Sequence, residues 1–268
     1  MTLKFTILGC GSSMGVPRAA LGWGDCDPGE PKNRRRRCAL LVERAQGPGK
    51  VTRVLVDCGP DLREQLIDAK VDWLDAVMIT HEHADHTHGL DDLRPLSVHK
   101  RHRVDVYMDD ATSHAMNNRF GYCFHTPAGS NYPPILKEHR LVAGKPVTIH
   151  GQGGAIEVLP ILQDHGDIHS LGFRFGNVAY STDLKRLPDA SIAALAGLDI
   201  WIVDALRRHP HPSHMNLHET LDWIARIKPK RAILTDMHTD MDYATLRAEL
   251  PAGIEPAYDG MHFERSAT

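Results

Sequence analysis

The chain has 268 residues and a hydrophobic fraction of 42%, enough to bury a sizeable core, and its formal net charge of -3 lacks the basic excess typical of nucleic-acid-binding proteins. No apolar run reaches membrane-spanning length, and the opening MTLKFTILGCGSSMG lacks the apolar stretch of a signal peptide. The five cysteines form no CxxC pair, which fits a reducing compartment, so we expect a cytoplasmic protein that does not bind membranes.

The first half of the chain contains five short apolar segments bounded by Gly, Asp or Pro, which predict buried strands. These strands are expected at residues 4–8, 39–43, 53–56, 76–79 and 104–108. Helices are expected at residues 61–69 and 111–117. Residues 22–37 and 118–134 are rich in turn formers, and we expect two long loops there.

The second half repeats this pattern. Strands are expected at residues 156–161, 171–175, 178–181, 200–203 and 232–235, and helices at residues 191–196, 217–228 and 243–250. Asn216 followed by Glu219 indicates an N-cap and a capping box for one of these helices. No change of composition marks a linker, so residues 1–268 are expected to form one domain, with two packed sheets and helices outside.

The segment THEHADHTHG, residues 80–89, carries the strongest functional signal in a chain with eighteen histidines. It follows a predicted strand, and residues i and i+2 of an extended chain point the same way, so His81 and His83 can bind one ion together. Asp85 and His86 follow as the chain turns toward a helix, and they can bind a second ion. Such nitrogen and oxygen ligands suit zinc, manganese or iron.

Each ion needs about four ligands, so this segment supplies only half of a two-metal site. Three candidates for the missing ligands, His165, Asp183 and His238, lie at the ends of later predicted strands. A carboxylate has two oxygens, so Asp183 can bridge both ions.

In order and spacing, THxHxDH, the following HG, the later STD and the late histidine resemble the metallo-β-lactamase fold superfamily over nearly the whole chain. The resemblance implies an α/β fold, an αββα sandwich of two mixed β-sheets flanked by helices, with two divalent metal ions, zinc or manganese, at one sheet edge. The implied ligands are His81, His83 and His165 for one ion, Asp85, His86 and His238 for the other, and Asp183 as the bridge.

The segments ILGCGSSMGVPR, RFGYCF, HGDIHSLGFRF and HPSHMNLHETL resemble the branch that opens phosphoribosyl 1,2-cyclic phosphate. This implies a phosphodiesterase for a small cyclic or nucleotide-like phosphodiester, in which a water activated at the two metals attacks phosphorus. His214 matches a histidine that acts near the leaving group, and Asp85 is expected to orient the water as well as bind metal.

Two alternatives stay open. One is a tRNA 3′-processing endonuclease, which the pI of 6.6 and the lack of a basic, glycine-rich arm disfavour. The other is a non-catalytic carrier or cofactor-biosynthesis protein on the same fold. The expected partner is a small phosphodiester rather than a nucleic acid, and a homodimer is compatible with the sequence.

Several weaker signals near the motif have two interpretations. Asp57 either accepts the free N–H of a metal-binding histidine, as an aspartate of the resembled family does, or is a turn residue before Gly59. His88 is expected to be a bystander. Many members of the resembled branch bind a structural zinc in the early loop, but here the loop offers only Cys26 and Cys38, so we do not expect that zinc.

Residues outside the motif also leave alternatives. The arginines at 34–37 either contact a substrate phosphate or form a solvated face. Phe120, Tyr122 and Phe124 either stack on a substrate ring or anchor their loop. The histidines at 209 and 211 are expected to be solvated, and Gly9-Cys10-Gly11-Ser12-Ser13 is either an anion-binding nest or a tight turn.

Overall fold

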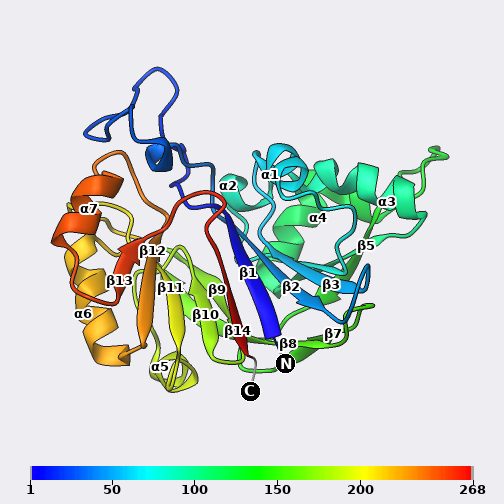
Figure 1. Ribbon diagram of the computed structural model, residues 1–268. Helices are drawn as coiled ribbons and strands as arrows, with labels where there is room; N and C mark the ends of the chain where they lie inside the picture. Colours follow the sequence, from blue (N-terminus) through cyan, green and yellow to red (C-terminus); the bar gives the residue numbers. More distant parts are fainter. Residues whose placement is uncertain (1, 267–268) are drawn as a thin grey trace.

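Two seven-stranded β-sheets pack face to face, with helices on both outer sides, in a computed structural model that describes residues 2–266 (Figure 1). From edge to edge the first sheet contains β14 (His262–Ser266), β1 (Thr2–Gly9), β2 (Ala39–Ala45), β3 (Val51–Val56), β4 (Ala76–Met78), β5 (Val104–Met108) and β6 (Leu136–Arg140). The second contains β13 (Ile254–Pro256), β12 (Arg231–Thr235), β11 (Ile200–Asp204), β10 (Val178–Ser181), β9 (Ile168–Phe175), β8 (Ile156–His165) and β7 (Val147–Ile149). The predicted αββα sandwich is therefore confirmed.

The helices divide between the two outer faces. Those of the first half are α1 (Leu62–Asp68), α2 (Ala84–Thr87), α3 (Arg94–Lys100) and α4 (Asp110–Phe124), and those of the second half are α5 (Asp189–Ala194), α6 (Leu217–Ile227) and α7 (Tyr243–Glu249). In Figure 1 the first group lies beside β3 and β5, and α6 and α7 lie beyond β12 and β13. The predicted capping box starts α6, where Asn216 and Glu219 each accept the other's backbone N–H.

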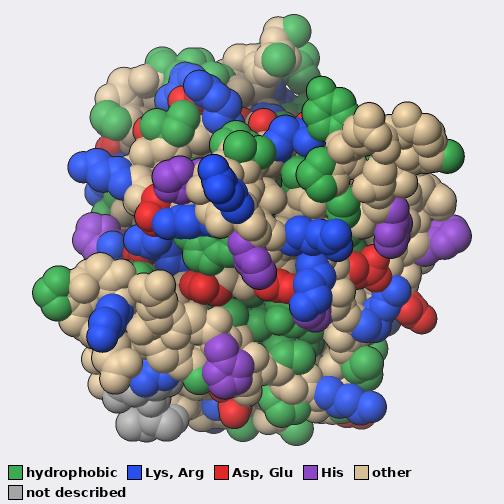
Figure 2. All heavy atoms as spheres, turned by 90° about the vertical axis from the view of Figure 1, so that its right-hand side faces the viewer, with side chains coloured by type: hydrophobic (Ala, Val, Ile, Leu, Met, Phe, Trp, Pro, Cys, Tyr) green, Lys and Arg blue, Asp and Glu red, His purple; other side chains and the backbone are tan. Residues whose placement is uncertain are grey.

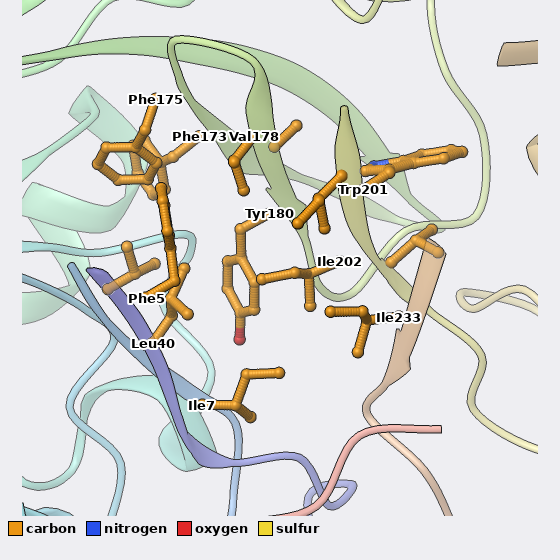
Figure 3. Close-up of a cluster of buried hydrophobic side chains, with 14 of the residues drawn as sticks. Phe5, Ile7, Leu40, Phe173, Phe175, Val178, Tyr180, Trp201, Ile202 and Ile233 are labelled. Atoms are coloured by element: carbon orange, nitrogen blue, oxygen red, sulfur yellow. The ribbon is translucent and has the colours of Figure 1, made fainter. Parts of the chain in front are cut away.

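The largest apolar core lies between the sheets. Phe5 and Ile7 alternate with polar residues along β1 and point inward, where they meet Tyr180 and Ile202 of the second sheet (Figure 3). All four are fully buried, and burial of each apolar side chain contributes about 1.5–3 kcal/mol. A smaller apolar cluster fills the space between the first sheet and its helices. The two clusters fix the strands whose ends carry the site.

Both sheets are mixed. β3, β4, β5 and β6 are parallel to one another, and so are β10, β11, β12 and β13. The carboxyl ends of parallel strands meet at the same edge of a sheet, which is where functional side chains of such sheets gather. The residues that follow β3, β4, β10, β11 and β12 therefore share one region of the molecule.

One secondary-structure prediction needs correction, and four strands were not predicted. Residues 118–124 are not loop, because α4 continues to Phe124, with a local distortion at Phe120. The buried side chains of Cys123 and Phe124 hold this last turn against the helix-covered face of the first sheet. The sequence contained no strong signal for β6, β7, β13 and β14. All four are edge strands, β7 and β13 are only three residues long, and β6 and β14 carry many polar residues.

Within residues 2–266, no helix is long and apolar enough to cross a membrane.

Candidate metal centre

Three histidines and one aspartate converge beyond the ends of β4, β8 and β10. One potential ligand atom from each of His81, His83, His165 and Asp183 lies within 4.8 Å of the others. His81 Nε2 and His165 Nε2 lie 2.9 and 3.2 Å from His83 Nδ1, and each lies 3.6 Å from Asp183 Oδ1. Three ring nitrogens and one carboxylate oxygen thus lie close together, a donor set that suits a tetrahedral divalent ion.

A second group shares Asp183. His86 Nε2 lies 3.0 Å from Asp183 Oδ2 and 3.3 Å from Asp85 Oδ2. The two oxygens of Asp183 therefore face different groups, the position that a bridging ligand needs. His86 Nε2 is buried and has no hydrogen-bond partner among residues 2–266. Buried polar atoms are rarely left unpaired, and an ion at this point would satisfy the nitrogen.

The electrostatics of both groups fit divalent cations. Burial lowers the pKa of His81 and of His165, so both rings are held neutral, the form that binds metal. Burial acts against ionisation of Asp183, but the neighbouring His86 outweighs it and holds the pKa of Asp183 well below its usual range. The chemistry of this donor set therefore matches two metal ions.

Asp57 takes the supporting position that the sequence suggested. Its carboxylate accepts the Nδ1–H of His86 at 2.7 Å and both the backbone N–H and the hydroxyl of Thr80, at 2.9 and 3.0 Å. This contact fixes the tautomer of His86 and leaves its Nε2 facing Asp183 and Asp85.

Sequence reasoning missed two buried aspartates, Asp204 at the end of β11 and Asp236 just after β12. Both face His214, whose Nδ1 lies 3.0 Å from Asp204 Oδ2 and 3.2 Å from Asp236 Oδ2. Asp183, His214 and Asp236 form a third group with ligand atoms within 4.8 Å. The available signal was positional, since WIVD and ILTD each place an aspartate directly after an apolar strand.

His238 lies outside all three groups of described residues. Its Nε2 is 3.2 Å from Arg18 Nη1, and its Nδ1 is 3.6 Å from Asp240 Oδ1. The ring lines the same pocket as the metal groups without joining them.

A family model described as a β-lactamase superfamily domain matches residues 52–237, well over half of the chain. The chain belongs to the β-lactamase superfamily. A crystal structure described as a new diphosphatase from the PhnP family is 36% identical, with a TM-score of 0.87, and the match covers 99% of this chain and 98% of that one. Zn²⁺-bound PqqB from Methylobacterium extorquens is 17% identical with a TM-score of 0.70, covering 97% and 99% of the two chains, and shares the fold.

Two curated relatives are longer than this chain. An octanoyltransferase of Porphyromonas gingivalis is 31% identical over 264 residues, which are 97% of this chain and 51% of the relative. The exodeoxyribonuclease WalJ of Streptococcus pneumoniae is 34% identical over 79 residues, 30% of this chain and 24% of the relative. The chain thus spans about half the length of the first relative and matches a quarter of the second.

Side chains from the three groups of potential metal ligands line a pocket of about 260 Å³. Ser12, Ser13 and Met14 form part of its wall and belong to the early loop, which is the segment 10–38 between β1 and β2. Arg207 and His211 form another part. His211 is half-buried rather than solvated, and its ring lies 5.0 Å from that of His214. Burial, with His214 nearby, lowers the pKa of His211 to about 4. His88 lies apart from these groups and packs edge-on against Phe120.

The arginines at 34–37 anchor the early loop to the rest of the β-lactamase fold. Arg35 is only 2% exposed and donates to the backbone oxygens of Met241 and His238 at 2.7 and 3.4 Å. Arg36 pairs with Asp68 and Asp259, and Arg37 pairs with Asp61. Three of the four are therefore held by the protein itself, while Arg34 is exposed.

The early loop is closed by polar contacts, and neither of its cysteines joins a metal-binding group within residues 2–266. Asn33 is buried and donates to Asp242 at 2.7 Å, and Arg35 donates to Asn33 at 3.2 Å. Cys26 lies 3.9 Å from Arg35, whereas Cys38 lies 3.7 Å from Asp236. In the other long segment, Phe124 is buried in the core, Phe120 packs on His88, and Tyr122 is 46% exposed.

Proposed function

We propose that this β-lactamase superfamily member is a hydrolase with two divalent metal ions that cleaves small cyclic or nucleotide-like phosphodiesters, including diphosphate diesters. The observation that carries the proposal is the position of Asp183. Its two oxygens face two separate groups of metal ligands, and His214 stands beside them in the same pocket.

Two bound ions would activate water and neutralise charge on a phosphate, which is the chemistry that such pairs supply. The chain must then protonate the leaving oxygen, and His214 is placed to do so. Asp204 occupies its Nδ1 side, so Nε2 faces the pocket, 3.8 Å from Asp183 Oδ1. Burial opposes protonation of this ring, but Asp204 and Asp236 outweigh burial and raise the pKa of His214 to about 12. His214 therefore carries the proton that a general acid needs.

Pocket size and charge favour a small substrate. A volume of about 260 Å³ is near the lower end for ligand sites and suits a phosphorylated sugar or nucleotide better than a polymer. On the face shown in Figure 2, basic, acidic and histidine side chains are interspersed rather than gathered by sign. With a net charge of -3, this distribution favours a small phosphodiester over tRNA.

The likeness to a diphosphatase of the PhnP family, which extends over nearly the whole of both chains, supports cleavage of a P–O bond. The name octanoyltransferase belongs to a protein about twice as long as the matched segment, so acyl transfer serves here as a rival to be tested.

The test is hydrolysis by purified protein loaded with zinc or with manganese. The substrates are bis-p-nitrophenyl phosphate, cyclic phosphoribose and a dinucleoside diphosphate. Wild type and His88→Ala should turn over at least one of them at similar rates, because His88 lies outside the metal groups. Asp183→Ala should be inactive. Failure to cleave any phosphodiester with both ions bound would refute the proposal in favour of a non-catalytic role, and consumption of an octanoyl thioester would favour acyl transfer.

A further inference from the structure

The ligand set of the second ion is incomplete without one more residue. Asp85, His86 and Asp183 supply three side chains, and a divalent ion commonly takes about four ligands. The family resemblance assigns the fourth position to His238. The structure offers a different residue two positions earlier in the chain.

The ring of His238 is held away from the metal groups by the early loop. Arg18 Nη1 lies against His238 Nε2 at 3.2 Å, and Asp240 lies on the Nδ1 side. Arg18 is itself fixed, because its backbone N–H and carbonyl both bond to Gly22, at 2.9 and 2.8 Å. Arg35 then ties the loop to the backbone of the segment that carries His238. Both ring nitrogens of His238 therefore have partners in the protein.

Asp236, which follows β12, lies next to the metal-binding groups. It is 2% exposed and follows β12 directly, and one of its carboxylate oxygens lies within 4.8 Å of ligand atoms of Asp183 and His214. Oδ1 has the thiol of Cys38 beside it, at 3.7 Å, and the buried Oδ2 lies 3.2 Å from His214 Nδ1 without forming a hydrogen bond among residues 2–266. The ring of His214 is shared with the buried carboxylate of Asp204, so a further cation beside Asp236 would balance the carboxylate charge that His214 leaves over.

Three aspartates that follow strands share an uncommon backbone conformation. Asp57 after β3, Asp183 after β10 and Asp236 after β12 all have positive φ, at 63°, 50° and 60°. This conformation is uncommon for residues other than glycine, and such strain concentrates at functional sites. The first aspartate orients His86 and the second lies between the metal groups. The third has the same conformation and lies against the second.

We propose that Asp236, and not His238, completes the ligand set of the second ion beside Asp85, His86 and Asp183. The first ion then has three imidazoles and one carboxylate, whereas the second has three carboxylates and one imidazole. Carboxylate-rich sites suit manganese, and imidazole-rich sites suit zinc. The centre is therefore asymmetric, with the manganese preference on the side of Asp236. This inference rests on the metal centre and not on the choice of substrate.

The experiment measures metal binding without any substrate. Apoprotein of wild type, Asp236→Ala, Asp236→Asn and His238→Ala is titrated with Mn²⁺ by calorimetry, and ions per chain are counted by elemental analysis. Both Asp236 variants should bind one of the two Mn²⁺ ions at least about 10-fold more weakly, since loss of even a supporting group costs 10–100-fold. His238→Ala should bind both ions as wild type does.

Asp236→Asn keeps the shape of the side chain and serves if Asp236→Ala does not fold. Loss of an ion from His238→Ala, or undiminished Mn²⁺ affinity in Asp236→Asn, overturns the assignment. In a competition between the two metals, Asp236→His should bind a larger share of zinc, and an unchanged share overturns the proposed asymmetry. A protein that binds two ions by way of Asp236 and yet cleaves no phosphodiester would refute the proposed function while leaving this inference intact.

Discussion

Replacement of His214 by asparagine distinguishes the roles of its two ring nitrogens. Nδ1 faces the buried Asp204 at 3.0 Å, and Nε2 faces the pocket. The amide nitrogen of asparagine stands the same number of bonds from Cα as Nδ1, so His214→Asn can keep the contact with Asp204 while it removes the group proposed to protonate the leaving oxygen. His214→Ala removes both.

The two losses have different sizes. A lost general acid lowers turnover by roughly 10²–10⁴-fold, or about 3–5 kcal/mol in the barrier. A lost hydrogen bond to a charged group lowers stability by about 1.5–3 kcal/mol, because Asp204 is fully buried and keeps only the backbone N–H of Leu184 on the same oxygen. Both variants should therefore lose turnover, and His214→Ala should unfold at lower denaturant than His214→Asn.

The assay combines steady-state turnover of cyclic phosphoribose, whose leaving group is an alcohol that needs a proton, with urea unfolding and metal content. Wild-type kcat in His214→Asn would show that Nε2 moves no proton in the slow step. A loss of bound metal from either variant would show instead that His214 is a ligand.

Three further outcomes are expected. Asp57→Asn should weaken Mn²⁺ binding by about 10–100-fold, because His86 loses its carboxylate partner, and unchanged affinity in a titration would contradict this role. Arg18→Ala should raise KM more than it lowers kcat, because its guanidinium holds the ring of His238, which lines the pocket. The exposed Arg34→Ala is the matched control, and equal KM values for the two variants would refute this role. Arg35→Met should cost at least about 3 kcal/mol of folding free energy in urea, since it removes several buried charge-assisted hydrogen bonds, and a loss under 1 kcal/mol would exclude that role.

Local spacing explains which site residues the sequence could predict. His81, His83, Asp85 and His86 lie in one segment, and the alternation of a strand is enough to pair the first two. Asp183 follows an apolar strand, and the shared edge of parallel strands brings it to the same place. The order and identity of these residues needed no knowledge of distant contacts.

The positions of the other site residues depend on contacts between segments far apart in the sequence. Asp204 and Asp236 look like ordinary turn aspartates after a strand, and their burial depends on how the second sheet packs. Asp236 and His238 are two residues apart after the same strand, and the family resemblance implied the histidine. The positive φ of Asp236 turns the chain at that point, and Arg18, more than two hundred residues away, faces the ring of His238.

The early loop links these observations, because it meets the segment after β12 at several points. Ser12 donates its backbone N–H to Met237, Asp25 donates to Thr239, and Arg35 reaches His238 and Met241. Backbone and guanidinium hydrogen bonds therefore hold this loop, and Cys26 and Cys38 are both buried free thiols. The same bonds also place Arg18 against His238. The contacts that hold the loop are therefore also the contacts that keep His238 occupied and leave the position after β12 to Asp236.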